Sequence, residues 1–176
     1  TSQRPPQPKR IMVHQAHRRP VRRAGQLPRP WDNTGMLLDA TDASAIERAA
    51  DILAGGGLLG LPTETVYGLA ARADDDRAVA AIFAAKGRPA GHPLIVHVAD
   101  AAGAEPFVQE GFLQQLPDHS AALMRAFWPG PLTVIVPRRE GVANAAAGRH
   151  PTIGLRSPAH PAAQAVLRAL LQRGVP

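Results

Sequence analysis

The chain has no cysteine, and aromatic side chains make up only 4% of its 176 residues. The lack of cysteine excludes disulfide bonds and thiolate metal sites. No apolar run approaches the ~18 residues that a membrane span needs. The first residues also lack the charged-then-apolar pattern of a secretory signal. We therefore expect a cytoplasmic protein without a membrane segment, and a chain of this length can form one domain with a real core.

Positive charge is concentrated at the start of the sequence. Residues 1–35 hold eight basic residues and one acidic residue, whereas the other 141 residues hold twelve basic and thirteen acidic ones. The formal net charge of +6 therefore belongs to the first segment. This segment also has six prolines and no apolar periodicity, so it cannot bury enough surface to offset its conformational entropy. We predict a disordered basic extension over 1–35 and a domain over 36–176.

Apolar periodicity predicts helices and strands that alternate after Asp42. The first helix is predicted to begin at Asp42 or at Ser44, where Ser44 and Glu47 have the spacing of a capping box. The predicted helices are 44–53, 74–86, 121–127 and 162–171, and the predicted strands are 58–61, 94–98, 132–136 and 153–155. This alternation favours an α/β sheet domain.

Three glycines match the GxGxxG pattern of dinucleotide-binding loops: Gly55, Gly57 and Gly60. In that loop the glycines follow a strand and open a helix, whose N-terminus binds the pyrophosphate. Here they leave a predicted helix and enter a strand. The match therefore carries little weight, and the chain has no Walker A sequence either.

Two cations flank a glycine in the sequence Lys86-Gly87-Arg88-Pro89. On a turn fixed by Gly and Pro, they can converge on one polyphosphate. The same residues also suit the end of a helix, where Lys and Arg complement the helix dipole. The local sequence leaves both interpretations open.

Polar side chains also stand at strand ends and within one strand. The loop around Thr65 follows a predicted strand, and Arg156 follows another, where it could hold a carboxylate. His97 lies in an apolar strand and is either a structural side chain or a substrate contact. His92 and His97 are five residues apart, so alternation would place them on opposite faces, which disfavours a shared metal site.

Five motifs occur together in a fixed order. They are 62–69 (PTETVYGL), 86–89 (KGRP), 92–97 (HPLIVH), 128–133 (WPGPLT) and 154–158 (GLRSP), the last followed by His160 and Pro161. With this order the sequence closely resembles the YrdC-like threonylcarbamoyl-AMP synthase family from about Asp42 to Pro176. Glu64 stands where many relatives carry Asp, which we take as a neutral variation.

The resemblance implies a twisted mixed β-sheet with flanking helices. It also implies synthesis of threonylcarbamoyl-AMP from L-threonine, bicarbonate and ATP, with Mg²⁺, for tRNA modification. By position, the threonine contacts implied are Thr65, His97 and Arg156. The ATP contacts implied are Lys86, Arg88, His92 and Thr152, with Lys86 and Arg88 stabilising the charge that develops on the phosphates.

One departure from the family concerns the end of the chain. Relatives continue past the equivalent of Pro176 into a Ser-Ala-Asn motif, so we expect the C-terminal part of the domain to be missing and this piece to be inactive alone. Further partners implied are tRNA or double-stranded RNA and a downstream tRNA threonylcarbamoyl transferase complex. Two alternatives stay open: a non-enzymatic RNA-binding module, favoured by the basic extension, and a carbamoyl-transfer domain of a larger enzyme.

Overall fold

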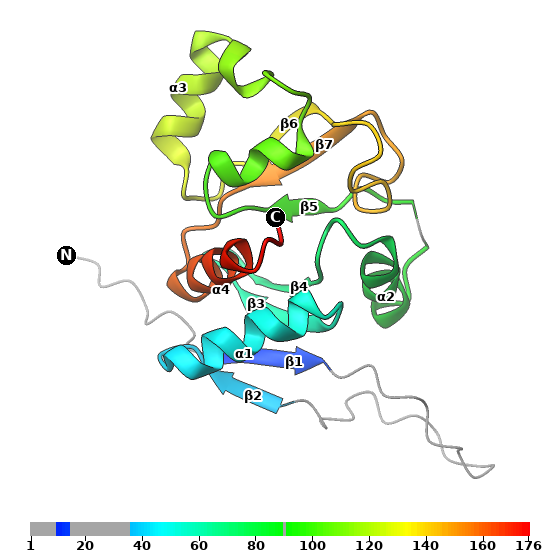
Figure 1. The fold of residues 1–176 in the computed structure, drawn as a ribbon, viewed down its shortest axis with the longest axis vertical. Helices are drawn as coiled ribbons and strands as arrows, with labels where there is room; N and C mark the ends of the chain where they lie inside the picture. Colours follow the sequence, from blue (N-terminus) through cyan, green and yellow to red (C-terminus); the bar gives the residue numbers. More distant parts are fainter. Residues whose placement is uncertain (1–9, 15–35, 90) are drawn as a thin grey trace.

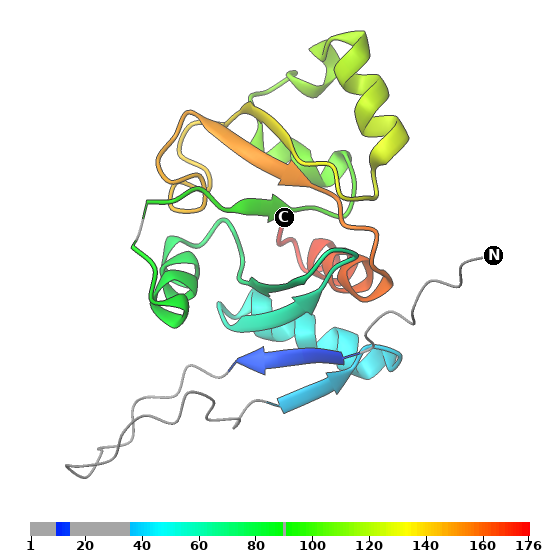
Figure 2. The ribbon, with the colours of Figure 1, turned by 180° about the vertical axis from the view of Figure 1, so that it is seen from behind.

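The strands form two sheets in the computed structural model, which describes residues 10–14, 36–89 and 91–176 (Figures 1 and 2). The first sheet is antiparallel and has the order β2-β1-β3-β4, whereas the second has the order β5-β7-β6, with β5 parallel and β6 antiparallel to β7. The strands are β1 (Arg10–His14), β2 (Met36–Asp39), β3 (Leu58–Pro62), β4 (Tyr67–Ala70), β5 (Ile95–His97), β6 (Val134–Pro137) and β7 (Thr152–Arg156). The α/β class with mixed pairing and flanking helices is confirmed.

Strand β1 corrects the prediction for residues 1–35. Its residues 10–14 are ordered and pair with both β2 and β3, so the prediction of disorder is wrong for this stretch. Ile11 is fully buried and Val13 is 3% exposed, while Met12 between them is 45% exposed. Alternation of this kind is typical of a strand with one face on the core. Only Ile11 and Val13 of this strand face the core. Two alternating apolar residues in a proline-rich segment are too few to predict a strand. Residues 1–9 and 15–35 lie outside the described residues.

Four α-helices and two short 3₁₀ helices are found among the described residues: α1 (Ala43–Ala54), α2 (Asp76–Lys86), α3 (Asp118–Phe127), α4 (Pro161–Gln172), η1 (Ala102–Phe107) and η2 (Leu113–Gln115). Each predicted helix is present. Helix α1 is capped by Asp42, whose side chain accepts from the backbone N–H of Ser44. Of the two predicted starts, Asp42 is therefore correct, and the capping box at Ser44 is wrong because Ser44 lies within the helix. None of these helices has both the length and the hydrophobicity that crossing a membrane takes.

Helix α2 ends where the sequence predicts. Asp75 caps its N-terminus by accepting from the N–H groups of Arg77 and Ala78. Gly87 ends the helix with φ +61°, a left-handed conformation that glycine adopts without steric cost. The turn thus places Lys86 in the last helical position and Arg88 just beyond the helix.

Two hydrophobic cores underlie the two sheets. The first lies between the four-stranded sheet and helices α1 and α4, which cover one of its faces in Figure 1. The second packs the three-stranded sheet against α2, η1 and residues 143–146. The glycines of the GxGxxG match lie between α1 and β3 and within β3, in the order opposite to a dinucleotide loop. The residues predicted for the site come from both sheets, because the loop around Thr65 follows β3 and Arg156 ends β7.

Candidate functional site

The loop after β3 is built around the hydroxyl of Thr63. Thr63 Oγ1 donates to the carbonyl of Val66 (2.7 Å) and accepts from the N–H groups of Thr65 (3.3 Å) and Val66 (3.1 Å). Because that donor is used, the Thr65 hydroxyl donates to Thr63 Oγ1 (3.0 Å). The oxygen of Thr65 is thereby left with lone pairs for another partner. A hydroxyl that closes a turn in this way fixes the loop without any regular pairing.

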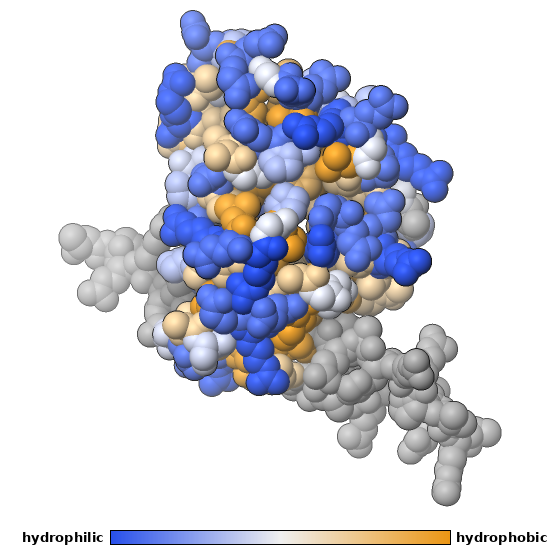
Figure 3. Space-filling view, in the orientation of Figure 1, coloured by the Kyte–Doolittle hydropathy of each residue, from blue (hydrophilic) through white to orange (hydrophobic). Residues whose placement is uncertain are grey.

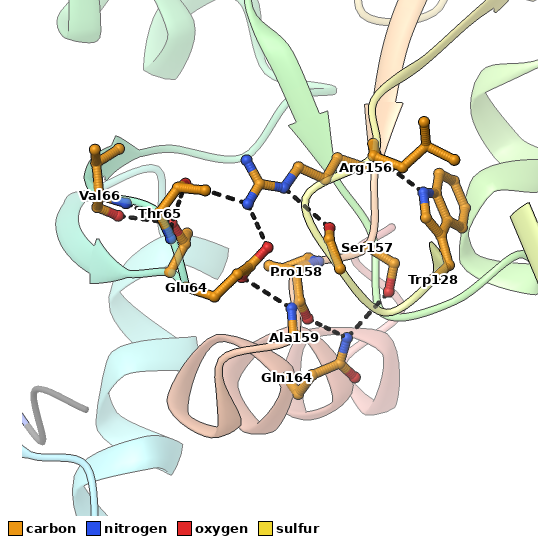
Figure 4. A network of polar contacts seen from close by, with 12 residues as sticks. Glu64, Thr65, Val66, Trp128, Arg156, Ser157, Pro158, Ala159 and Gln164 are labelled. Carbon is orange, nitrogen blue, oxygen red and sulfur yellow. Dashed lines mark hydrogen bonds and ion pairs between the residues drawn. The ribbon is translucent and has the colours of Figure 1, made fainter. Parts of the chain in front are cut away.

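That partner is Arg156, at the end of β7 (Figure 4). Its Nη2 donates to Thr65 Oγ1 (3.2 Å) and to a carboxylate oxygen of Glu64, and its Nε donates to the carbonyl of Gly130 (3.2 Å). Nη1 has no hydrogen-bond partner within 10–14, 36–89 and 91–176 and carries no dashed line in Figure 4. A planar guanidinium held on two sides presents its remaining N–H groups in a fixed direction.

Glu64 supplies the negative charge that a buried guanidinium needs. Arg156 is only 8% exposed, and an unpaired charge at such a position would be costly. Burial alone would raise the pKa of the Glu64 carboxyl, but the hydrogen bond and charge of Arg156 and the backbone N–H of Ala159 outweigh it and hold the pKa below its usual value. Glu64 is therefore ionised at neutral pH.

His97 is the register partner of Arg156 in the parallel pairing of β5 and β7. Its Nδ1 lies 3.2 Å from the carbonyl of Ile95, and since a carbonyl only accepts, Nδ1 carries the proton. Burial lowers the pKa of His97, and the charge of Arg156 acts in the same direction. The ring is therefore neutral at pH 7, with Nε2 as a hydrogen-bond acceptor.

A pocket of about 350 Å³ is lined in part by Thr63 and His97, whereas Glu64, Thr65 and Arg156 lie outside its lining. Such a volume is in the range of small-molecule sites. Its polar lining comprises Thr63, Arg72, Lys86 and His97, and the rest is mainly aliphatic, including the last residues, Val175 and Pro176. Figure 3 shows hydrophobic patches near the middle of a largely hydrophilic face. The pocket thus brings the lysine at the end of α2 to the same cavity as the histidine of β5.

The other residues predicted for the nucleotide lie outside that lining. Arg88 and His92 are exposed on the segment between α2 and β5, and Thr152 is exposed at the start of β7. The backbone N–H of Arg88 donates to the carbonyl of Phe83 (3.0 Å), which completes the helix end. The structure therefore joins Thr65, His97 and Arg156 in one cluster and adds Lys86 through the pocket. Arg88, His92 and Thr152 are exposed, and none of them contacts the cluster or lines the pocket in the described part of the chain.

Two contributions to the cluster were missed by sequence reasoning. Glu64 was taken as a neutral variation, although it pairs with Arg156 across 92 positions of the chain. Gly130 belongs to the motif 128–133, from which no site residue was predicted, yet its carbonyl accepts from Arg156. No local pattern could reveal either contact, because each joins segments that only the fold brings together.

Comparison with known proteins identifies the family. The profile of the Sua5, YciO and YrdC proteins, described as "Telomere recombination", matches residues 51–173. The chain belongs to the Sua5/YciO/YrdC family. The threonylcarbamoyl-AMP synthase of Pyrococcus abyssi is 44% identical over 115 residues, which are 65% of this chain and 32% of that protein. The threonylcarbamoyl-AMP synthase of Bacillus subtilis is 38% identical over 130 residues, 73% of this chain and 36% of that protein.

Solved structures of the Sua5/YciO/YrdC family have the same fold. P. abyssi Sua5 complexed with L-threonine superposes with a TM-score of 0.68 at 40% identity, covering 74% of this chain and 37% of that one. E. coli YciO superposes with a TM-score of 0.62 at 27% identity, covering 73% and 60%. The chain thus spans about a third of the length of the two synthases it matches.

Proposed function

We propose that the protein is an L-threonylcarbamoyladenylate synthase, which forms threonylcarbamoyl-AMP and pyrophosphate from L-threonine, bicarbonate and ATP. The observation that carries this proposal is the cluster of Thr65, His97 and Arg156, in which a fixed guanidinium and a neutral imidazole lie in register on adjacent strands. Two relatives of that name and a relative solved with L-threonine support it.

The cluster suits a zwitterionic amino acid. Nη1 of Arg156 can bind a carboxylate, for which a guanidinium is well matched in geometry and charge. His97 Nε2 can accept a hydrogen bond from the ammonium or hydroxyl group of threonine, and the Thr65 oxygen is close to Arg156 (3.2 Å from Nη2). The cluster thereby offers a donor to the carboxylate of the substrate and an acceptor to its ammonium or hydroxyl group.

The residues proposed to bind ATP include two cations, Lys86 and Arg88. Lys86 lines the same pocket as His97, and the exposed Arg88, His92 and Thr152, outside that lining, complete the set that we assign to ATP. Among the described residues no cluster of three or more His, Asp or Glu side chains could hold a metal ion. Mg²⁺ belongs to the same proposal through ATP, whose phosphates it commonly binds.

The proposed reaction has two stages. The free amine of threonine adds to the carbon dioxide that bicarbonate gives by losing hydroxide, and the new N–C bond forms as the amine loses a proton, so the stage yields a carbamate and one water. A carbamate oxygen then attacks the α-phosphorus of ATP, and pyrophosphate leaves. Negative charge grows on the phosphate oxygens, so Lys86 and Arg88 act by alignment and electrostatic stabilisation, and no covalent nucleophile is needed.

The product is a mixed anhydride, which must pass quickly to an acceptor. We propose that a tRNA threonylcarbamoyl transferase consumes it in the cytoplasm, where ATP and tRNA are available. Mg²⁺, tRNA and the transferase complex are thus parts of the same proposal.

Product analysis tests the function directly. The complete gene product is incubated with L-threonine, isotope-labelled bicarbonate and Mg-ATP, and threonylcarbamoyl-AMP is measured by mass spectrometry together with pyrophosphate. We expect labelled product and pyrophosphate in equal amounts, and neither when threonine is omitted. Pyrophosphate or phosphate release that is independent of threonine, or no labelled product, would contradict the proposal.

A further inference from the structure

Glu64 and Arg156 form the most enclosed ion pair of the described residues. Their side chains are 13% and 10% exposed, whereas every other paired side chain is at least 23% exposed. Solvent and salt screen an enclosed pair less than an exposed one. The position of the Glu64 carboxylate therefore has a strong influence on the position of the guanidinium.

Both oxygens of Glu64 are in use. Oε1 accepts from Nη2 of Arg156, and Oε2 accepts from the backbone N–H of Ala159 (3.0 Å). Ala159 lies in the turn between β7 and α4. The carboxylate thus joins the loop after β3 to the exit of β7, which belongs to the other sheet. A change in Glu64 would release Arg156 and this turn together.

The contacts of Arg156 show what Glu64 contributes. Gly130 accepts from Nε, and Glu64 and Thr65 accept from Nη2, so two of the three guanidinium nitrogens are occupied by protein. We infer that Glu64 is a positioning residue for the amino-acid site: it holds the Arg156 plane so that Nη1 meets the substrate carboxylate, and it does not touch the substrate. This inference rests on the proposed function of the same site.

An opposite role for Glu64 is chemically conceivable. Its carboxylate could occupy Arg156 as a stand-in for the substrate and have to leave before threonine binds. Departure would break the bond to Ala159 as well and leave the guanidinium of Arg156, only 10% exposed, without its anion, which is costly. The two roles predict opposite effects of removing the charge: positioning predicts weaker threonine binding, and competition predicts tighter binding.

The test is threonine affinity in variants of the complete gene product, measured by calorimetry. For Glu64→Gln we expect the dissociation constant of L-threonine to rise about 10-fold or more, because the charged contact that holds Arg156 is replaced by a neutral one, while ATP affinity is unchanged. Glu64→Asp keeps the charge and should therefore lower threonine affinity less than Glu64→Gln does. Glu47→Gln is the matched control, since Glu47 pairs with Arg173 at a more exposed site and should leave threonine affinity unchanged.

A double-mutant cycle separates positioning from direct contact. In an Arg156→Lys background, measured at millimolar threonine by NMR, Glu64→Gln should change the affinity by less than about twofold, because its effect passes through Arg156. An equal loss of threonine affinity with Arg156 and in the Arg156→Lys background would overturn the inference. Unchanged or tighter threonine binding in the single variant Glu64→Gln would overturn it as well. If Glu64→Gln does not fold, the cycle is run with Glu64→Asp, whose shorter side chain displaces the charge: a smaller rise in the dissociation constant is then expected with Arg156 present and none in the Arg156→Lys background, and no rise in either, or an equal rise in both, overturns the inference. Absence of threonine binding by the wild type would instead refute the proposed function.

Discussion

His97 and Arg156 are direct partners in the parallel register of β5 and β7. Partner residues lie on the same face of a sheet, so the imidazole and the guanidinium face the same space. Protonation of His97 would place a second positive charge beside Arg156, and burial opposes that charge as well. The pair can therefore offer one cation and one neutral acceptor to a ligand at neutral pH.

Threonine binding should depend on pH through His97. The pKa of His97 is lowered, so affinity should stay constant as pH falls from 8 to the ordinary value of about 6.5 and should decline only below it. The free energy of unfolding should depend on pH in the same way, because the unfolded chain binds this proton at a higher pH than the folded chain. The contribution of neutral His97 to stability is therefore fully present above about pH 6.5 and is lost as the pH falls through the folded pKa. Calorimetry and urea unfolding at several pH values measure both effects.

The control for this prediction is His97→Asn, in which this part of the pH dependence should vanish. His119→Asn, at an exposed position on α3, should keep it. Equal pH profiles for wild type and His97→Asn would show that another group titrates.

Lys86 and Arg88 should each matter for the chemical step. In the complete gene product, Lys86→Ala or Arg88→Ala should lower the rate of pyrophosphate release at least ~100-fold, because a charge contact to the transition state is lost. Arg77→Ala, at the exposed start of the same helix, is the matched control and should leave the rate unchanged. Wild-type turnover in both Lys86→Ala and Arg88→Ala would contradict their assignment to ATP.

Gly57 should be required for packing and not for nucleotide binding. A Cβ at this position would lie 2.7 Å from Cγ2 and 2.9 Å from the carbonyl oxygen of Ile52. Gly57→Ala should therefore lower the free energy of unfolding by about 1 to 3 kcal/mol, as overpacking does, with unchanged ATP affinity below the melting transition. Gly103→Ala, where an added Cβ meets only ordinary contacts, should cost much less. Selective loss of ATP binding in Gly57→Ala would revive a dinucleotide-type role for this loop.

The start of the chain should contribute to stability. Ile11 is fully buried in β1, so Ile11→Ala should lower the free energy of unfolding by about 2 to 5 kcal/mol. Met12→Ala, at a half-exposed neighbouring position, should cost far less. Chemical unfolding followed by circular dichroism distinguishes the two. If both substitutions were neutral, β1 would not be part of the cooperative fold.

Local sequence patterns predicted all four α-helices of the described residues and some of the strands. The stripe of Ile46, Ala49, Ala50 and Leu53 predicted α1, and all four residues are buried. The acidic start and Gly87 predicted the ends of α2. In contrast, β4 was taken as loop, since its four residues, 67–70, include a glycine and lie next to a polar turn. The strand forms because β3 offers it an antiparallel partner, which no local pattern specifies.

The sequence named residues for a candidate site but could not give their arrangement. The resemblance of the motifs supplied Thr65, His97 and Arg156, and these do come together. Glu64 could not be recognised, because its importance comes from an ion pair that forms only when the two sheets meet. Burial of Arg156 creates the need for that carboxylate, and burial is a property of the fold.

The most direct test of this account is the binding of L-threonine and of threoninol, which lacks the carboxylate, to wild type and to Arg156→Lys. We expect wild type to bind threonine at least ~10-fold more tightly than threoninol, and Arg156→Lys to lose this preference, because the two N–H groups of Nη1 are replaced by a differently placed ammonium. ATP affinity serves as the folding control. An equal preference for threonine in wild type and Arg156→Lys would contradict the assignment of Arg156 to the carboxylate.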